Sequence, residues 1–376
     1  MSISHIDPHS ARISASTVWT FVRVVDDDHV EGWGEATLQG EAAAIHRHVE
    51  DFAVEFRTRS VQSALDVAAT RGPVAATSAE AAALCAIDQA LRDLSARKRG
   101  RPLHAELGEA QRSRIPLYAN INRGTVDRSP AGFARRAAEA VTSGFAAVKI
   151  APFDGVTPGI AETARGETLI RAGIERIAAV REAIGVDRRL LVDCHWRLTE
   201  ASALRVLDTL EAVRLFWFEC PLLEEVSQFE ALRRIRHRAN TLGVLTAGCE
   251  SLTGLGAFQS FLDAGVYDVI MPDVKYAGGL AEMLRIAEAA ATHGTLCSPH
   301  NPSGPIAHLH SVHVSALIGA LPFLEFQYGE SERFFDLVEG DLPDPRGGTS
   351  ALPSGAGLGA RIAMDTLAEL SVSRVD

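Results

Sequence analysis

The feature that most constrains the fold is an alternation of short apolar runs with amphipathic segments, which begins near residue 113. The apolar runs read as strands and lie at 115–121, 146–151, 190–195, 215–221, 244–250, 267–273, 295–300 and 323–328. Helical patterns lie at 131–143, 166–184, 200–213, 227–239, 255–264 and 279–293. Strands that alternate with helices form a parallel sheet with right-handed crossovers, and eight such strands close a (β/α)8 barrel. A doubly wound open sheet is the alternative, which is disfavoured because no GxGxxG loop follows a predicted strand.

An α+β unit precedes the barrel pattern. Residues 12–38 predict a β-hairpin with its turn at 26–28, and residues 40–107 carry a helical pattern. The tail is rich in Pro and Gly before a short helical piece at 360–371, and it is expected to fold back onto the N-terminal unit. The predicted domains are an α+β domain at 1–112, a barrel domain at 113–330 and a returning C-terminal segment at 331–376.

Charge and composition exclude several classes of partner. The formal net charge of −11 provides no basic face for a nucleic acid or an anionic membrane. No apolar run approaches the roughly 20 residues of a membrane helix, and the first ten residues have no apolar core, so we expect no signal peptide. The five cysteines are widely spaced and form no CxxC pair, which is typical of reduced thiols. We therefore expect a cytoplasmic protein that acts on a small molecule.

Ionisable side chains fall at the ends of the predicted strands, about one strand–helix unit apart. From the second strand onward they are Lys149, Asp193 with His195, Glu219, Glu250, Asp273, His300 and Glu325. In a barrel these strand ends meet at the C-terminal mouth, where such folds carry out chemistry. Buried charges at that place must pair with one another or bind a metal. The series therefore predicts an active site.

Three of these residues predict a magnesium site. Asp193, Glu219 and Glu250 come from consecutive strands and offer hard oxygen ligands, which Mg²⁺ prefers. Zinc would favour His or Cys. A structural ion-pair network is the alternative for the carboxylates. The cysteines beside them are expected to be small packing residues, because strand alternation turns the neighbour of an inward residue away from the lumen.

The remaining strand-end residues predict acid–base chemistry. Asp273 would fix one ring nitrogen of His300 and leave the other as a general base. Lys149 would place positive charge beside a developing enolate oxygen. Glu325 could donate or accept a hydrogen bond to a substrate carboxylate. His195 lies two residues after a predicted metal ligand, on the same face of that strand, and is a candidate acid.

Several segments, taken in order, resemble the mandelate racemase-like branch of the enolase superfamily. GlyTrpGlyGluAla (32–36), AlaIleAspGlnAlaLeuArgAspLeu (86–94), ArgProLeu (101–103) and LeuGly (107–108) are similar to the capping domain of that family. ValLysIleAla (148–151), ValAspCysHisTrpArg (192–197), PheGluCysPro (218–221), CysGluSer (249–251), MetProAspValLysTyrAlaGlyGly (271–279), SerProHisAsnProSerGlyPro (298–305) and LeuGluPhe (324–326) are similar to its barrel motifs.

The resemblance implies a fold and a set of roles. The fold would be a modified (β/α)8 barrel with an α+β capping domain, and relatives of this kind are commonly homo-oligomers. The implied Mg²⁺ ligands are the three carboxylates named above, and the implied general base is the His300–Asp273 dyad. Glu325 is implied as the electrophilic partner of the substrate carboxylate. The Asp-x-His motif looks like that of acid-sugar dehydratases of the galactonate type, in which this His, here His195, protonates the departing hydroxyl.

The predicted function is a Mg²⁺-dependent dehydratase that converts a sugar acid, an aldonate or aldarate, into a 2-keto-3-deoxy acid. Ala151 stands where racemases of this branch usually have a second lysine, which weakens a two-base proton transfer. One alternative is a racemase, an epimerase or a lactone cycloisomerase with Lys275 as a base, unless Lys275 points away to a surface carboxylate. Another is a non-catalytic sugar-acid-binding protein. By the resemblance, substrate specificity would reside in capping loops at about 14–20 and 40–55.

Overall fold

Eight parallel strands in the middle of the chain form the predicted barrel. The computed structural model describes residues 2–14 and 17–371. The strands are β4 (Arg114–Asn120), β5 (Ala147–Ile150), β6 (Arg189–Asp193), β7 (Trp217–Glu219), β8 (Leu245–Gly248), β9 (Val269–Ile270), β10 (Leu296–Cys297) and β11 (Leu324–Gln327). Strands β4 to β10 pair in sequence order, and β11 pairs in parallel with β4. The amide of Glu325 donates to the Pro299 carbonyl at 3.4 Å, which connects β11 to the chain after β10. An open sheet with this strand order would leave β10 and β11 at separate edges, whereas this contact brings them together, so the doubly wound alternative is wrong.

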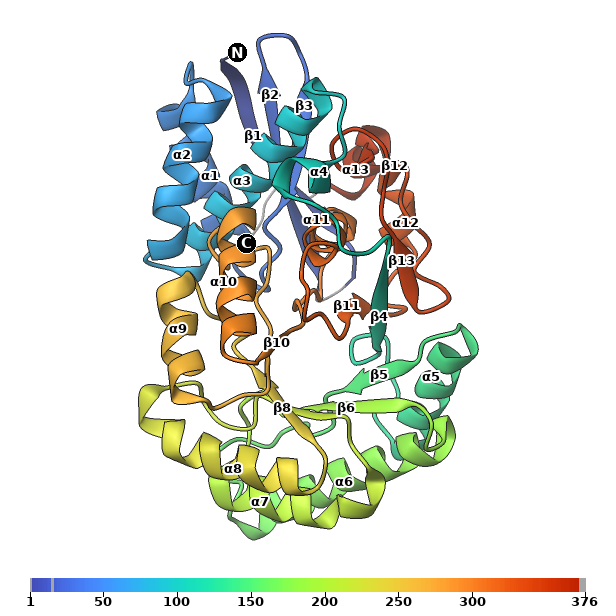
Figure 1. The fold of residues 1–376 in the computed structure, drawn as a ribbon. Helices are drawn as coiled ribbons and strands as arrows, with labels where there is room; N and C mark the ends of the chain where they lie inside the picture. Colours follow the sequence, from blue (N-terminus) through green and yellow to red (C-terminus); the bar gives the residue numbers. More distant parts are fainter. Residues whose placement is uncertain (1, 15–16, 372–376) are drawn as a thin grey trace.

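Helices follow the strands and lie along the outside of the barrel, as Figure 1 shows for α5 to α10. They are α5 (Pro130–Thr142), α6 (Ala164–Ile184), α7 (Glu200–Thr209), α8 (Phe229–Thr241), α9 (Leu255–Ala264), α10 (Leu280–Thr292) and α11 (Pro305–Ser315), with short 3₁₀ turns at Glu211–Val213 and Val226–Gln228. Ser129, Thr163 and Thr199 begin three of them, and each side chain accepts a hydrogen bond from the backbone amide three residues later. Helix α11 was not predicted.

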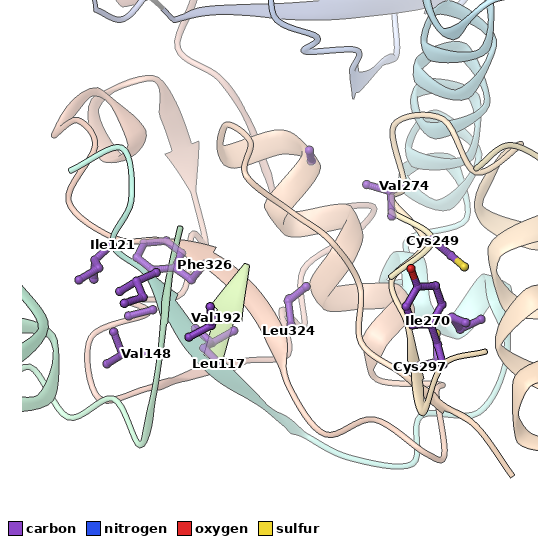
Figure 2. Packing of buried hydrophobic residues seen from close by; sticks show 14 of the residues in the cluster. Leu117, Ile121, Val148, Val192, Cys249, Ile270, Val274, Cys297, Leu324 and Phe326 are labelled. Carbon is purple, nitrogen blue, oxygen red and sulfur yellow. The ribbon is translucent and has the colours of Figure 1, made fainter. Parts of the chain in front are cut away.

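Alternation along the strands separates two apolar layers. Outward residues such as Leu117, Val148 and Val192 belong to the large core between the strands and the helices, and Figure 2 shows them gathered on neighbouring strands. Inward residues such as Tyr118 and Trp217 fill the interior of the barrel. The barrel is therefore closed below by side chains and keeps open space at the carboxyl ends of the strands.

The N-terminal unit is an antiparallel sheet covered by helices. Its strands are β1 (Ile3–Arg12), β2 (Val18–Asp26) and β3 (Glu31–Glu35), and its helices are α1 (Ala42–Phe56), α2 (Val61–Arg71), α3 (Ser78–Lys98) and α4 (Leu103–Leu107), with a 3₁₀ turn at Gly72–Val74. The predicted hairpin is confirmed as β2 and β3, whereas β1 was not predicted. A Cβ on Gly34 would lie 1.9 Å from the Ala86 carbonyl oxygen, so this glycine lets α3 pack directly on the sheet.

The C-terminal segment joins both parts of the molecule. It contains α12 (Arg333–Asp336), β12 (Val338–Gly340), β13 (Thr349–Ala351), β14 (Ala360–Ile362) and α13 (Met364–Leu370). Strand β13 pairs with β4 of the barrel, and Ser371 forms a bridge to Ala11 of β1. The predicted helix at 360–371 is wrong for its first three residues, which pair as a strand with β12. The domain boundaries at 112 and 330 stay a prediction. None of the described helices is long and apolar enough to cross a membrane.

Candidate functional site

Strand alternation carries charged side chains to the mouth of the barrel on three neighbouring strands. The interior positions just below the mouth on β5, β6 and β7 hold Ala147, Leu191 and Trp217. The residues two positions later face the same way, and they are Lys149, Asp193 and Glu219. All three are buried, and Asp193 lies directly opposite Glu219 in the register of β6 and β7. The inward positions of these three predicted residues follow from the alternation of side chains along each strand and from where each strand ends.

Glu250 reaches the same place by a break in that period. Ala247 faces the interior from β8, so unbroken alternation would next point Cys249 inward. Cys249 instead packs in the outer core with a φ of 70°, a left-handed conformation, and Glu250 faces the mouth. Glu224 Oε1 accepts a hydrogen bond of 2.5 Å from the Cys249 amide. Gly248 makes room for this contact, because a Cβ there would lie 2.4 Å from that oxygen.

The three predicted metal ligands form one cluster. Asp193, Glu219 and Glu250 each offer a carboxylate oxygen, and these oxygens lie within 4.8 Å of one another. Burial, followed by repulsion from Asp193 and Glu219, raises the pKa of Glu250 well above its usual value. Among the described residues, Glu250 Oε2 has no hydrogen-bond partner. A divalent cation would relieve the mutual repulsion and bind the unsatisfied oxygen, and carboxylate oxygens are the hard donors that such a cation prefers, so these residues could hold a metal ion.

Lys149 lies between two of the buried carboxylates. Its Nζ is 2.7 Å from Glu219 Oε1 and 3.1 Å from Glu325 Oε1. Burial lowers the pKa of Lys149, but Glu219 and Glu325 raise it by more, so the amine is charged. Glu325 also accepts hydrogen bonds from Asn120 Nδ2 at 2.6 Å and from the Asn301 amide at 2.8 Å. Burial raises the pKa of Glu325, but the nearby cation and these donors lower it to about 2, so Glu325 is a carboxylate here.

The predicted dyad is present, with a lysine attached to it. His300 Nδ1 lies 2.8 Å from Asp273 Oδ2, and His300 Nε2 points to the carboxylate cluster, 3.6 Å from Glu250 Oε2. Lys275 Nζ donates to the same oxygen of Asp273 and to the Ser303 hydroxyl. Lys275 is 2% exposed, so the interpretation that it points away to a surface carboxylate is wrong. Its charge holds Asp273 ionised: burial raises the pKa of Asp273, but Lys275 and then His300 lower it below its usual value.

His195 lines the mouth on the opposite side from His300. Its Nε2 lies 2.8 Å from Asp193 Oδ2, and about a third of its side chain is exposed. Attraction to Asp193 raises the pKa of His195. The prediction that His195 reaches this place on the same face of the strand as Asp193 is wrong. Strand β6 ends at Asp193, and His195 has a left-handed φ of 49°. The side chain nevertheless lines the same cavity as Asp193, and its role as an acid stays a prediction.

These groups open into a cavity of about 730 Å³ between the barrel and the N-terminal unit. The N-terminal unit contributes Arg12, Thr17 and Val18 together with lining residues from 37–42. The first predicted specificity loop, 14–20, lines the cavity through Thr17 and Val18, whereas its residues 15–16 lie outside the described part of the chain. Of the second predicted loop, 40–55, only Gly40 and Ala42 line it. From Ala42 onward that segment is helix α1 and not a loop.

Four residues that were not predicted also organise the site. Asn120 ends the first barrel strand, and attention to uncharged polar strand ends would have found it. Asn301 and Ser303 lie in the motif after His300, but nothing in their spacing indicated that they bind Glu325 and Lys275. Glu224 lies in the loop after β7, and no pattern in the sequence indicates its contact with Cys249.

Comparisons with known proteins agree with this architecture. Residues 132–366 match the family described as "Enolase C-terminal domain-like", and residues 5–108 match "Mandelate racemase / muconate lactonizing enzyme, N-terminal domain". D-gluconate dehydratase from Thermoproteus tenax is 33% identical over 282 residues, which are 75% of this chain but only 54% of that relative. D-galactonate dehydratase from Xanthomonas oryzae is 28% identical over 367 residues, 94% of this chain and 91% of the relative. A mandelate racemase/muconate lactonizing enzyme from Jannaschia superposes with a TM-score of 0.86 at 24% identity, covering 100% of this chain and 98% of the other.

Proposed function

Because the chain belongs to the enolase superfamily, in its mandelate racemase / muconate lactonizing enzyme branch, we propose that it is a Mg²⁺-dependent dehydratase of sugar acids. The reaction removes the proton at C2 and the hydroxyl at C3 of an aldonate or aldarate. The resulting enol then tautomerises to a 2-keto-3-deoxy acid. The similarity to relatives named gluconate and galactonate dehydratase supports this class of substrate.

The arrangement of the two histidines carries the proposal. His300 and His195 approach the carboxylate cluster from different sides, the first beside β10 and the second beside β6. Dehydration needs a base at C2 and an acid at C3, and two histidines around one cavity can serve as that pair. Each histidine is bound to a carboxylate, Asp273 or Asp193, which fixes its orientation.

His300 is the proposed base. Asp273 occupies its Nδ1, which leaves Nε2 facing the cavity with a lone pair. The proton at C2 of a carboxylate is weakly acidic, so charge that develops on the carboxylate oxygens must be stabilised in place. Lys149 lies beside the carboxylate cluster, 4.0 Å from Asp193 Oδ2, and supplies a fixed positive charge for this purpose. Mg²⁺ held by Asp193, Glu219 and Glu250 would supply Lewis-acid polarisation of the substrate carboxylate.

His195 is the proposed acid. Its ring lines the cavity beside the carboxylate cluster, where a protonated imidazole could donate to a leaving hydroxyl. Glu325 is assigned a supporting role toward the substrate carboxylate. It is ionised in this structure, so donation of a hydrogen bond would require a proton that arrives when the anionic substrate binds and raises its pKa.

The position of Lys275 favours elimination over racemisation. A two-base proton transfer needs bases on opposite faces of C2. Lys275 and His300 both bind Asp273 Oδ2, so they lie on the same side of the cavity. The place of a second lysine near Lys149 is taken by the buried Ala151. Both observations support a single-base abstraction followed by loss of water.

The test is incubation of the Mg²⁺-loaded protein with a panel of aldonates and aldarates, followed by an assay for 2-keto-3-deoxy acids. We expect turnover of at least one member, and loss of that turnover in His300→Asn. His293→Asn, a surface histidine at the end of α10, is the matched control and should keep full activity. Exchange of the C2 proton with solvent deuterium without loss of water would establish an epimerase instead. Saturable binding with neither exchange nor turnover would establish a non-catalytic binding protein.

A further inference from the structure

The outer part of the cavity is cationic in a chain whose net charge is −11. Three arginines line it, Arg12 from the N-terminal unit and Arg123 and Arg197 from loops after β4 and β6. Among the described residues, the acidic side chains that line the cavity are Asp193 and Glu250, which belong to the proposed metal site. The carboxylates that line the cavity are buried at the strand ends beside Lys149 and Lys275, whereas Arg12 and Arg123 are exposed, so we call the part of the cavity that the three arginines line its rim.

Contacts between the N-terminal unit and the barrel bring two of these arginines to one side of the rim. Arg12 pairs with Val18 in the register of β1 and β2, so it lies beside the turn that carries Thr17. The Thr17 hydroxyl donates to Glu330 Oε1 at 2.7 Å. Arg123 Nη1 lies 3.5 Å from both oxygens of Glu330. The same nitrogen donates to the carbonyl of Pro302, two residues after the proposed base, at 3.1 Å.

Two of the three guanidinium groups have no carboxylate partner among the described residues. Arg12 is exposed and enters no ion pair there. Arg197 is half-buried, and its side chain donates to the Phe153 carbonyl at 2.7 Å without an acidic partner. A guanidinium presents several donors in a fixed plane that matches the two oxygens of a carboxylate. Unpaired groups of this kind on the wall of a cavity are suited to an anionic part of a ligand.

We propose that the cavity binds a sugar acid with an anionic group at each end, with the first carboxylate at the metal site and the second anionic group at the arginine rim. This proposal rests on the proposed function and narrows its substrate class to aldarates over aldonates. A monocarboxylate would leave Arg12 and Arg197 without a counter-charge, whereas the distal carboxylate of an aldarate provides one. A phosphorylated aldonate presents the same distal negative charge, so the test includes one.

The experiment compares kcat/KM for galactarate with galactonate, for glucarate with gluconate, and for 6-phosphogluconate, using the Mg²⁺-loaded protein. We expect kcat/KM for the preferred substrate with a distal anionic group to exceed kcat/KM for its matched aldonate at least tenfold. Arg12→Gln should lower that preference at least tenfold, mostly through KM. Arg171→Gln, an exposed arginine on α6, is the matched control and should leave the preference unchanged. Preference for 6-phosphogluconate over both aldarates would assign the rim to a phosphate.

A binding measurement separates this inference from the proposed function. Calorimetry on His300→Asn with Mg²⁺ measures the affinity for galactarate and galactonate without turnover. Tighter binding of galactarate that Arg12→Gln removes would support the distal site even if no substrate is dehydrated. Equal affinities, or an aldonate preference that Arg12→Gln does not change, would overturn the distal site and leave the dehydratase proposal standing if an aldonate is turned over.

Discussion

Replacement of Glu35 by Gln tests how the N-terminal unit holds the catalytic loop. Glu35 ends β3 and is fully buried. Its Oε1 accepts hydrogen bonds from the Gly304 amide at 2.7 Å and the Thr37 hydroxyl at 2.8 Å, and its Oε2 accepts one from the Ala307 amide at 2.8 Å. Gly304 precedes α11 and has no side chain to cap that helix. A carboxylate from the other unit therefore caps α11, close behind the loop that carries His300.

The expected destabilisation by Glu35→Gln follows from the backbone amides that lose their hydrogen-bond acceptor. Gln keeps the volume of Glu35 but replaces one acceptor oxygen by an amide that donates. The backbone amide of Ala307 or Gly304 is then left buried and unsatisfied, which costs about 1–3 kcal/mol. Loss of the negative charge at the helix N-terminus adds about 0.3–1 kcal/mol. Burial raises the pKa of Glu35, so removing its charge recovers part of this cost. We expect a net destabilisation of about 2 kcal/mol.

Urea unfolding at neutral pH measures this change. Glu31→Gln is the matched control, because Glu31 begins the same strand and forms a partly exposed ion pair with Arg23, which contributes about 1 kcal/mol or less. We also expect kcat/KM to fall at least tenfold in Glu35→Gln, because the loop at 300–303 loses its anchor. If Glu35→Gln unfolds at the same urea concentration as Glu31→Gln and keeps wild-type kinetics, the proposed coupling between the two units is wrong.

Three further predictions concern the site and its surroundings. His300→Asn should abolish exchange of the C2 proton while leaving the affinity for Mg²⁺ within twofold; a large loss of Mg²⁺ affinity would contradict the assigned role. Chelation should lower Tm, and Mg²⁺ at 100 times its Kd should restore about 2.7 kcal/mol of unfolding free energy; an unchanged Tm would count against the metal site. Burial lowers the pKa of His308, His310 and His313 to about 3 from 6.5, so the unfolded chain gains protons first as the pH falls. Each of these histidines should therefore lower the free energy of unfolding by about 2 kcal/mol at pH 5. In urea unfolding, His313→Asn should reduce the loss of stability between pH 7 and pH 5 by that amount. The same pH dependence in His313→Asn and the wild type would refute this prediction.

Much of the fold was predictable because the barrel strands are short apolar runs with polar residues at their ends. Each of the eight runs overlaps one barrel strand. Six of these strands lie wholly within their runs, and β4 and β6 begin one residue earlier. Helix α11 was missed because every residue in it is buried, including three histidines, so it has no polar face to create an amphipathic pattern. Strand β1 was missed because His5, Asp7 and His9 make it polar, and its pairing with β2 comes from tertiary structure.

The site was predictable as far as strand alternation extends. Lys149, Asp193 and Glu219 follow from the period of two and from the strand ends. The inward position of Glu250 depends on a left-handed residue at Cys249, which no periodicity reveals. The hydrogen bonds that hold these groups come from loops and from a separate unit of the chain, and local sequence carries no record of such contacts.

We propose above all that three carboxylates from neighbouring strands hold one divalent cation at the mouth of the barrel. Anomalous diffraction from crystals soaked with Mn²⁺, in place of Mg²⁺, tests it most directly. The expected result is a single anomalous peak within about 2.3 Å of a carboxylate oxygen of each of Asp193, Glu219 and Glu250. The absence of a peak there at saturating Mn²⁺, or a peak that one of the three carboxylates does not reach, would contradict the claim.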